Sequence, residues 1–257
     1  MIHQRQLRMR DWERYVLLTL LGPLLWLQAK HVRRVTPRLP EPEGQRQGEA
    51  GQGPLVRVLV AGDSAAAGVG VSHQDEALCG QLVQRLSRHR TVQWCLLAAN
   101  GLDSPGLIQL LEETPHARFD VVVVSMGVND ATSLRPPRQW LQWQHRLAQV
   151  VEQRFAPNLL VHNAVPPMHA FTALPQPLRW FMGRWAKEMN HQLVGGLQQA
   201  PGRTIHWLPI ATAAEGLASD GFHPGARGYA LWAESLSERI LAATAVPANI
   251  QSVTAYQ

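Results

Sequence analysis

The amino-acid sequence predicts a parallel, doubly wound α/β fold. Apolar runs that read as strands alternate five times with longer segments of helical periodicity, which is the pattern of a sheet covered by helices on both faces. Two of the runs, VRVLVA (56–61) and FDVVVVS (119–125), are rich in β-branched residues and almost continuously apolar. Strands of this composition are typical of a sheet centre that is buried on both sides.

The expected elements follow one another along the chain in strand–helix order. The strand candidates are short and apolar: Val56–Ala61, Val92–Ala98, Phe119–Ser125, Leu159–His162 and Thr204–Leu208. The helix candidates are longer, with mostly helical spacing of apolar residues: Gln74–His89, Gly106–Glu113, Arg138–Phe155, Leu178–Gln199 and Ala226–Ala243. Ser104-Pro105 before the second of these helices is explained by an N-cap followed by proline at the first helical position. Together they predict one domain over residues 55–245, followed by a tail over 246–257.

Two further segments precede this domain. Residues 36–54 are rich in Pro, Gly, Glu and Gln with few apolar side chains, which predicts a linker. Residues 1–35 form a basic and apolar helical segment with an uncharged run over Tyr15–Leu27. As a helix this run spans about 20 Å, short of the roughly 30 Å of a bilayer core, and Gly22-Pro23 would kink it.

The N-terminal segment is expected to associate with a membrane surface through residues 14–34. Basic side chains stand on both sides of the apolar run: Arg5, Arg8, Arg10, Arg14, Lys30, Arg33, Arg34 and Arg38. The alternative is an apolar helix docked on the protein's own domain, with a cytoplasmic location.

Charge and cysteine content exclude several classes of protein. The net charge is +5, of which +4 lies in residues 1–50, so the remainder is nearly neutral. A nucleic-acid binder concentrates basic side chains on its folded surface, and that function is therefore not expected. Cys79 and Cys95 predict two buried thiols rather than a disulfide scaffold or a zinc site.

Polar and small residues follow several of the predicted strands. In a parallel sheet the ligand site lies beyond the carboxyl ends of the strands. Ser64 follows the first strand within Gly62-Asp63-Ser64, Gly101 the second, and Asn129 with Asp130 the third. Taken alone, Gly62-Asp63-Ser64 and Asn129-Asp130 are also explained by turn chemistry, whereas a glycine at position 101 lets a backbone N–H face a ligand without a Cβ in the way.

An acid–histidine pair stands near the C-terminus, where Asp220 precedes His223 by three residues. This spacing lets a carboxylate hold Nδ1–H and leaves Nε2 to accept a proton from a serine. Backbone N–H groups of Ser64 and Gly101, together with the Asn129 amide, would make three donors for an oxyanion.

The four segments in this order resemble the SGNH (GDSL) hydrolase family over residues 56–243. The resemblance implies a three-layer α/β/α sandwich with a flavodoxin-like sheet of five parallel strands. It implies ester hydrolysis through an acyl-enzyme, with Ser64 as nucleophile, His223 as base and then acid, and Asp220 as orienting carboxylate. Ser64, Gly101 and Asn129 would form the oxyanion hole, supported by Asp63 and Asp130. The small residues that follow Ser64, AAAGVG, depart from the bulkier residue that many members carry.

The substrate class stays open at this point. Met168, Phe171 and Phe181 follow the fourth strand and are the candidate acyl pocket, although helix packing also explains such residues. A lipid-like, lysophospholipid or acyl-thioester substrate is favoured. The alternatives are a carbohydrate de-O-acetylase and a non-catalytic binder of an acylated partner. The chemistry needs no metal or organic cofactor, and the sequence has no G-x-S-x-G elbow or phosphate-binding P-loop.

Overall fold

The computed structural model describes residues 11–197, 200–209 and 216–244. Within these residues the sheet has six strands in the order β1-β3-β2-β4-β5-β6. Five of them run parallel: β2 (Leu55–Gly62), β3 (Thr91–Ala98), β4 (Val121–Ser125), β5 (Leu159–Asn163) and β6 (Arg203–His206). The first ten residues and the predicted tail over 246–257 lie outside the described part of the chain.

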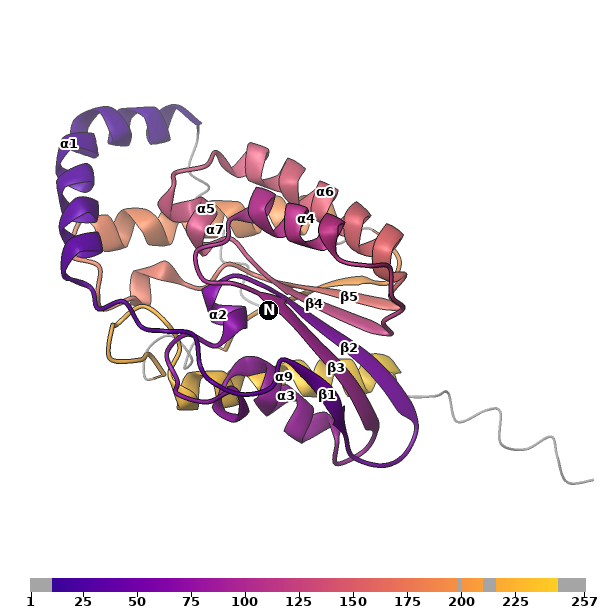
Figure 1. Ribbon diagram of the computed structural model, residues 1–257. Helices are drawn as coiled ribbons and strands as arrows, with labels where there is room; N and C mark the ends of the chain where they lie inside the picture. Colours follow the sequence, from indigo (N-terminus) through magenta and orange to yellow (C-terminus); the bar gives the residue numbers. More distant parts are fainter. Residues whose placement is uncertain (1–10, 198–199, 210–215, 245–257) are drawn as a thin grey trace, which may run out of the picture.

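Helices cover both faces of the sheet, which confirms the predicted three-layer α/β/α architecture (Figure 1). One face carries α4 (Ser104–Glu113), α6 (Pro137–Phe155) and α7 (Leu178–Leu197). The other face carries α3 (Leu78–Leu86) and α9 (Ala226–Thr244).

The side chains of β4 point alternately toward the two helix layers that cover the sheet. Val122 and Val124 belong to the core under α4, α6 and α7, whereas Val121 and Val123 belong to the core under α3 and α9. Because successive residues of a strand point to opposite faces, an unbroken valine run fits only a strand that is buried on both sides.

Short helices stand where strands end. The helix α2 (Ser64–Ala67) follows β2, α5 (Val128–Thr132) follows β4, and the 3₁₀ turn η2 (Met168–Ala170) lies in the loop after β5. A further 3₁₀ turn, η1 (Gln74–Glu76), leads into α3. These carboxyl-end segments are the ones that position the candidate site.

The sixth strand lies inside the predicted linker, and the expectation of a linker is wrong for this part of residues 36–54. β1 (Gln47–Ala50) pairs antiparallel with β3 at the sheet edge. Its Gly48 sits opposite Trp94, whose ring lies where a Cβ on Gly48 would come within 2.6 Å. An edge strand that is only partly buried needs few apolar side chains. The amino-acid composition of this segment is therefore like that of a linker, although the segment forms a strand.

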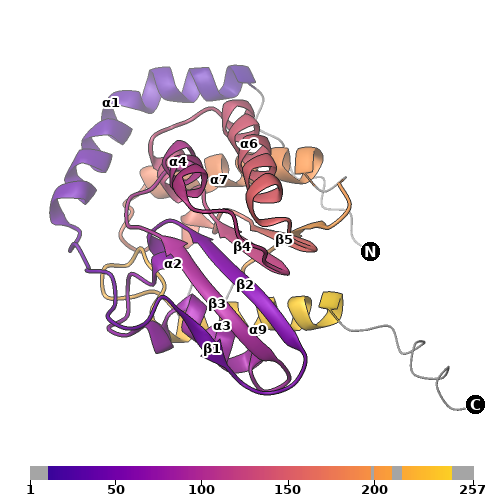
Figure 2. The ribbon, with the colours of Figure 1, turned by 45° about the vertical axis from the view of Figure 1, so that its right-hand side comes forward.

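The N-terminal helix α1 (Asp11–Val35) contains Pro23 and changes direction along its length (Figure 2). Leu25 and Val32 are buried in the core on the α7 side of the sheet. The Gln28 side chain donates to the carbonyl of Gln176 at 2.7 Å and accepts from the N–H of Leu178 at 3.1 Å. One face of α1 is therefore docked on the domain. Across the described ranges, no helix combines the length and the apolar character that crossing a bilayer requires.

Both cysteines are free thiols, with Cys79 buried in α3 and Cys95 half-buried in β3. Burial raises the pKa of the Cys79 thiol to about 12. Cys79 is therefore an unreactive core residue at neutral pH.

Candidate active site

Ser64 is the first residue of α2, directly beyond the end of β2. Asp63 caps this helix, because its side chain accepts from the N–H of Ala65 at 3.1 Å. Gly62 lies so close to the Ser125 carbonyl of β4 that a Cβ at this position would collide with it. The turn thus places a serine that is 8% exposed at the carboxyl edge of the two central strands.

His223 joins Ser64 to Asp220 in one chain of hydrogen bonds. The Ser64 Oγ lies 2.9 Å from His223 Nε2, and His223 Nδ1 lies 2.6 Å from Asp220 Oδ2. The aspartate can only accept, so the shorter contact is a donation from Nδ1–H, which leaves Nε2 able to accept the serine proton. The structure brings together the three residues that the sequence predicts as catalytic.

Asp220 is held by its own loop as well as by the histidine. Its Oδ1 accepts the backbone N–H groups of Phe222 at 2.9 Å and His223 at 3.0 Å. Burial acts to raise the pKa of Asp220, but these bonds and the one from the His223 side chain hold it below its ordinary value. The carboxylate therefore stays ionised at neutral pH and fixes the orientation of the imidazole.

The two other predicted oxyanion donors lie in adjoining loops. The Asn129 side chain donates to the carbonyl of Leu102 at 2.8 Å, which ties α5 to the loop that contains Gly101. An amide carries two N–H groups, so this bond orients Asn129 and leaves its second donor. Gly101 has φ of +84°, a conformation that favours glycine, and a Cβ at this position would meet no atom within 4 Å.

A buried acid network supports these loops. Asp130 is fully buried, accepts from the Ser104 hydroxyl at 2.8 Å, and lies 3.1 Å from the Arg135 guanidinium. Arg135 also pairs with Asp103 at 2.9 Å. Burial raises the pKa of Asp130, and the hydrogen bond from Ser104 partly offsets this rise. The expected N-cap at Ser104 is wrong by one residue, because Asp103 accepts from the Gly106 N–H and caps α4, which frees Ser104 to bind Asp130.

Asp63 lies beside the nucleophile and is 2% exposed. Burial raises the pKa of this carboxyl to about 7, against the opposing effects of the Ala65 N–H and the charge of His223. Asp63 contributes to the site by capping α2, the helix that begins with Ser64.

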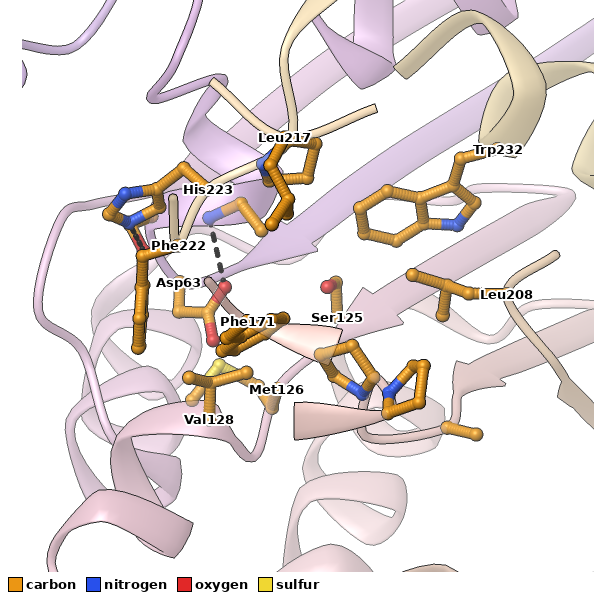
Figure 3. Close-up of a pocket in the computed structure, with 16 residues that line it drawn as sticks. Asp63, Ser125, Met126, Val128, Phe171, Leu208, Leu217, Phe222, His223 and Trp232 are labelled. Carbon is orange, nitrogen blue, oxygen red and sulfur yellow. Dashed lines mark hydrogen bonds between the residues drawn. The ribbon is translucent and has the colours of Figure 1, made fainter. Parts of the chain in front are cut away.

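A mainly apolar cavity of about 40 Å³ opens beside Ser64. Asp63, Phe222 and His223 stand at one end of it, and Leu208 and Trp232 at the other (Figure 3). Its other lining residues come from strand ends and loops: Ala65, Ser125, Met126, Val128, Ala164, Pro166, Pro167, Phe171, Leu217 and Pro224. Ser125 and Trp232 could not be predicted as lining residues, because nothing in the local sequence pattern shows that β4 and α9 meet at this point.

Of the three residues predicted to form an acyl pocket, one lines this cavity. Phe171 lines the cavity and packs on Phe222 with ring centroids 4.8 Å apart. Met168 and Phe181 do not line it and are fully buried in the core with α7. Neither side chain therefore reaches this cavity, and η2 and α7, which carry them, pack against each other. Among the described residues, no group of three His, Cys, Asp or Glu is arranged to hold a metal ion.

Residues 60–231 match the model of the GDSL-like lipase/acylhydrolase family, which is more than half of the chain. The chain belongs to this family. The match runs from β2 into α9 and includes every residue of the hydrogen-bonded chain described above.

Several solved structures share the fold of this GDSL-like protein. A carbohydrate esterase family 2 enzyme with a carbohydrate-binding domain from Corynascus thermopiles (Myceliophthora fergusii) has a TM-score of 0.60 at 15% identity, over 80% of this chain and 68% of that one. A putative arylesterase from Agrobacterium tumefaciens has a TM-score of 0.54 at 20% identity, over 72% and 98%. An acetylxylan esterase from Geobacillus stearothermophilus has a TM-score of 0.51 at 14% identity, over 74% and 95%. No curated protein matches the chain.

Proposed function

We propose that the protein is a serine esterase that acts through an acyl-enzyme on Ser64. The observation that carries the proposal is the unbroken chain from Ser64 Oγ through His223 to Asp220, at 2.9 and 2.6 Å. A serine hydroxyl is a weak nucleophile until a positioned base takes its proton. The geometry supplies both that base and the carboxylate that stabilises it once charged.

Each catalytic group acts once during acylation of Ser64 and once during hydrolysis of the acyl-enzyme. His223 Nε2 takes the Ser64 proton as Oγ attacks the ester carbonyl, and the carbonyl electrons move onto its oxygen. The N–H groups of Ser64 and Gly101 and the Asn129 amide stabilise that oxyanion. Collapse releases the alcohol, which takes the proton from His223, and water then repeats the sequence to release the acid.

Asn129→Ala is expected to lower kcat about 100- to 1000-fold, the usual loss when one oxyanion donor is removed. The measurement is hydrolysis of p-nitrophenyl butyrate, with thermal melting as the control for folding. Asn129→Asp, which keeps the size of the side chain but supplies no N–H when ionised, should be impaired at least as strongly. Full activity in Asn129→Ala would exclude the side chain from the oxyanion hole.

The cavity beside Ser64 supports an acyl group of short chain length. Its wall is hydrocarbon except near Asp63, Ser64, Ser125 and His223, so it favours an uncharged acyl chain. A volume of about 40 Å³ holds roughly three water-sized groups, which corresponds to about a butyryl chain. The cavity thus favours acetyl to butyryl esters over the long chains of a lipid-like substrate.

The chain-length profile tests this assignment. Among p-nitrophenyl esters, kcat/KM is expected to be highest between acetyl and butyryl and to fall steeply at octanoyl. Trp232→Ala, which opens the far end of the cavity, should shift the optimum to longer chains. A profile that rises to palmitoyl would reject the short-chain assignment and support the lipid-like substrate.

A carbohydrate de-O-acetylase is the second candidate, favoured by the same small cavity. It predicts a preference for acetyl over butyryl esters and release of acetate from an acetylated sugar polymer. Activity on butyryl esters equal to that on acetyl esters, without acetate release, would argue against it.

A further inference from the structure

The outer face of α1 carries an unusual share of exposed apolar side chains. Among the described residues, most of the large hydrophobic side chains that are well exposed belong to this one helix: Val16, Leu20, Leu24, Trp26, Leu27 and Val35. Leu20 is 74% exposed and Trp26 is 61% exposed. Exposed apolar side chains concentrated on one element are typical of an interaction site.

The exposed residues form a stripe opposite the docked face. Val16, Leu20, Leu24 and Leu27 recur at intervals of four, four and three residues, so they share one side of the helix. Leu25 and Val32, which are buried against the domain, point the other way. We call the four exposed residues the α1 stripe.

Positive charge is concentrated in the same part of the chain. Residues 1–38 contain eight Lys and Arg against two Asp and Glu, a net charge of +6, whereas the whole chain has +5. The rest of the protein therefore carries a net charge of −1. Lys30, Arg33 and Arg34 are exposed at the C-terminal end of α1.

An exposed tryptophan with a cation over its ring stands on each of the helices α1 and α7. Trp26 is covered by the Lys30 ammonium at 5.1 Å from the ring centroid, and Trp180 by the Arg184 guanidinium at 5.5 Å. Trp180 is 40% exposed and lies two residues from Leu178, which bonds to Gln28 of α1. Tryptophan beside a basic residue is typical of the boundary between lipid headgroups and acyl chains.

We propose that the α1 stripe binds the surface of an anionic phospholipid bilayer. The stripe would enter the boundary of the acyl chains while the neighbouring basic residues contact the headgroups. A second copy of the chain fits this face less well, because two such segments bring like charge together.

This attachment places the candidate active site near the lipid surface. α1 flanks the end of the molecule where α2, which begins with Ser64, follows β2 (Figure 1, Figure 2). The chain beyond α1 passes the Gly101 loop, where Glu41 accepts from the N–H of Asn100 at 2.6 Å. An ester held in or at the membrane would therefore meet the cavity without the enzyme leaving the surface.

Vesicle co-sedimentation of the full chain tests the proposal. Vesicles of equimolar phosphatidylglycerol and phosphatidylcholine should bind the protein, and pure phosphatidylcholine vesicles should bind it far more weakly. Each basic residue near an anionic bilayer contributes about a five-fold factor, so Arg33→Gln with Arg34→Gln should weaken binding about 25-fold. Equal binding to both kinds of vesicle would overturn the charge argument.

Two leucines of similar exposure, one inside the α1 stripe and one outside it, test whether vesicle binding depends on the stripe itself or on any exposed apolar side chain. Leu24 and Leu55 are 45% and 42% exposed, on α1 and at the start of β2 respectively. Leu24→Gln should weaken vesicle binding about ten-fold, and Leu55→Gln should leave it unchanged. Both variants should hydrolyse soluble p-nitrophenyl butyrate like the parent. Equal binding by the two variants would overturn the assignment of the stripe.

Two further measurements distinguish membrane binding from esterase activity and from dimer formation. Ser64→Ala protein should bind vesicles like the parent, because binding needs no catalysis, so failure of either proposal is visible without the other. Analytical ultracentrifugation tests the alternative partner. If the parent is a dimer that Leu24→Gln dissociates, and it does not bind anionic vesicles, a second copy occupies the stripe and the lipid proposal is wrong.

Discussion

Replacing Ser64 by alanine is expected to abolish ester hydrolysis, with a loss on the order of 10⁶-fold in kcat. The change removes the oxygen that lies 2.9 Å from His223 Nε2 and leaves the base with nothing to activate. Without a nucleophile no acyl-enzyme forms, and only the background reaction of water remains. The rate with p-nitrophenyl butyrate at saturating substrate measures the loss.

The fold should survive this substitution. Ser64 opens a helix that Asp63 caps, alanine is the best helix former, and one oxygen is a small change in volume. Equal melting temperatures for Ser64→Ala and the parent would show that the loss is chemical.

Labelling by a fluorophosphonate probe gives a second readout of the same residue. The parent should be labelled at Ser64 because the probe needs an oxygen activated by His223, and Ser64→Ala should not be labelled. Hydrolysis by Ser64→Ala at the rate of the parent would place the chemistry elsewhere. A parent that is neither active nor labelled would instead favour the non-catalytic binder.

Much of the fold could be predicted because its signals are local. The valine run of β4 has nearly continuous apolar character, and a two-sided sheet is the arrangement that buries every one of its side chains. The edge strand β1 could not be predicted in this way. Its partner is β3, more than forty residues further along the chain, and only the folded chain brings the Trp94 ring against Gly48.

The same division applies to the candidate site. Ser64, His223 and Asp220 could be predicted because they sit in short segments whose residue types and order are specific, and the structure brings them within hydrogen-bonding distance. The cavity could not be predicted, because its wall is made by side chains such as Ser125 and Trp232 that meet only through packing. Local sequence also cannot distinguish Phe171, which lines the cavity, from Phe181, which is fully buried.

Asp220→Asn is the second substitution with a large expected effect, a loss of about 10⁴-fold in kcat. Asparagine keeps the shape of the side chain, and its carbonyl can still accept the N–H groups of Phe222 and His223. Its amide nitrogen would then replace Oδ2, which now lies 2.6 Å from His223 Nδ1. A donor at that place favours the tautomer with hydrogen on Nε2, which cannot accept the Ser64 proton.

The effect should be on the chemical step rather than on binding. Asp220 is 5% exposed and is not among the residues that line the cavity, so KM for p-nitrophenyl butyrate should change little while kcat falls. Because its pKa lies below the ordinary value, the native carboxylate is ionised throughout the neutral range. Raising the pH from 6 to 8 therefore should not change its charge in the parent enzyme.

Asp63→Asn is the matched control for the loss of a buried carboxylate. Asp63 is also buried and lies closer in sequence to Ser64, but it bonds to the Ala65 N–H and not to His223 Nδ1. Asparagine is an equally good N-cap, so this variant should keep kcat within about ten-fold of the parent. If Asp220→Asn costs no more than Asp63→Asn, the orientation of His223 does not depend on Asp220, and a different group must hold the imidazole.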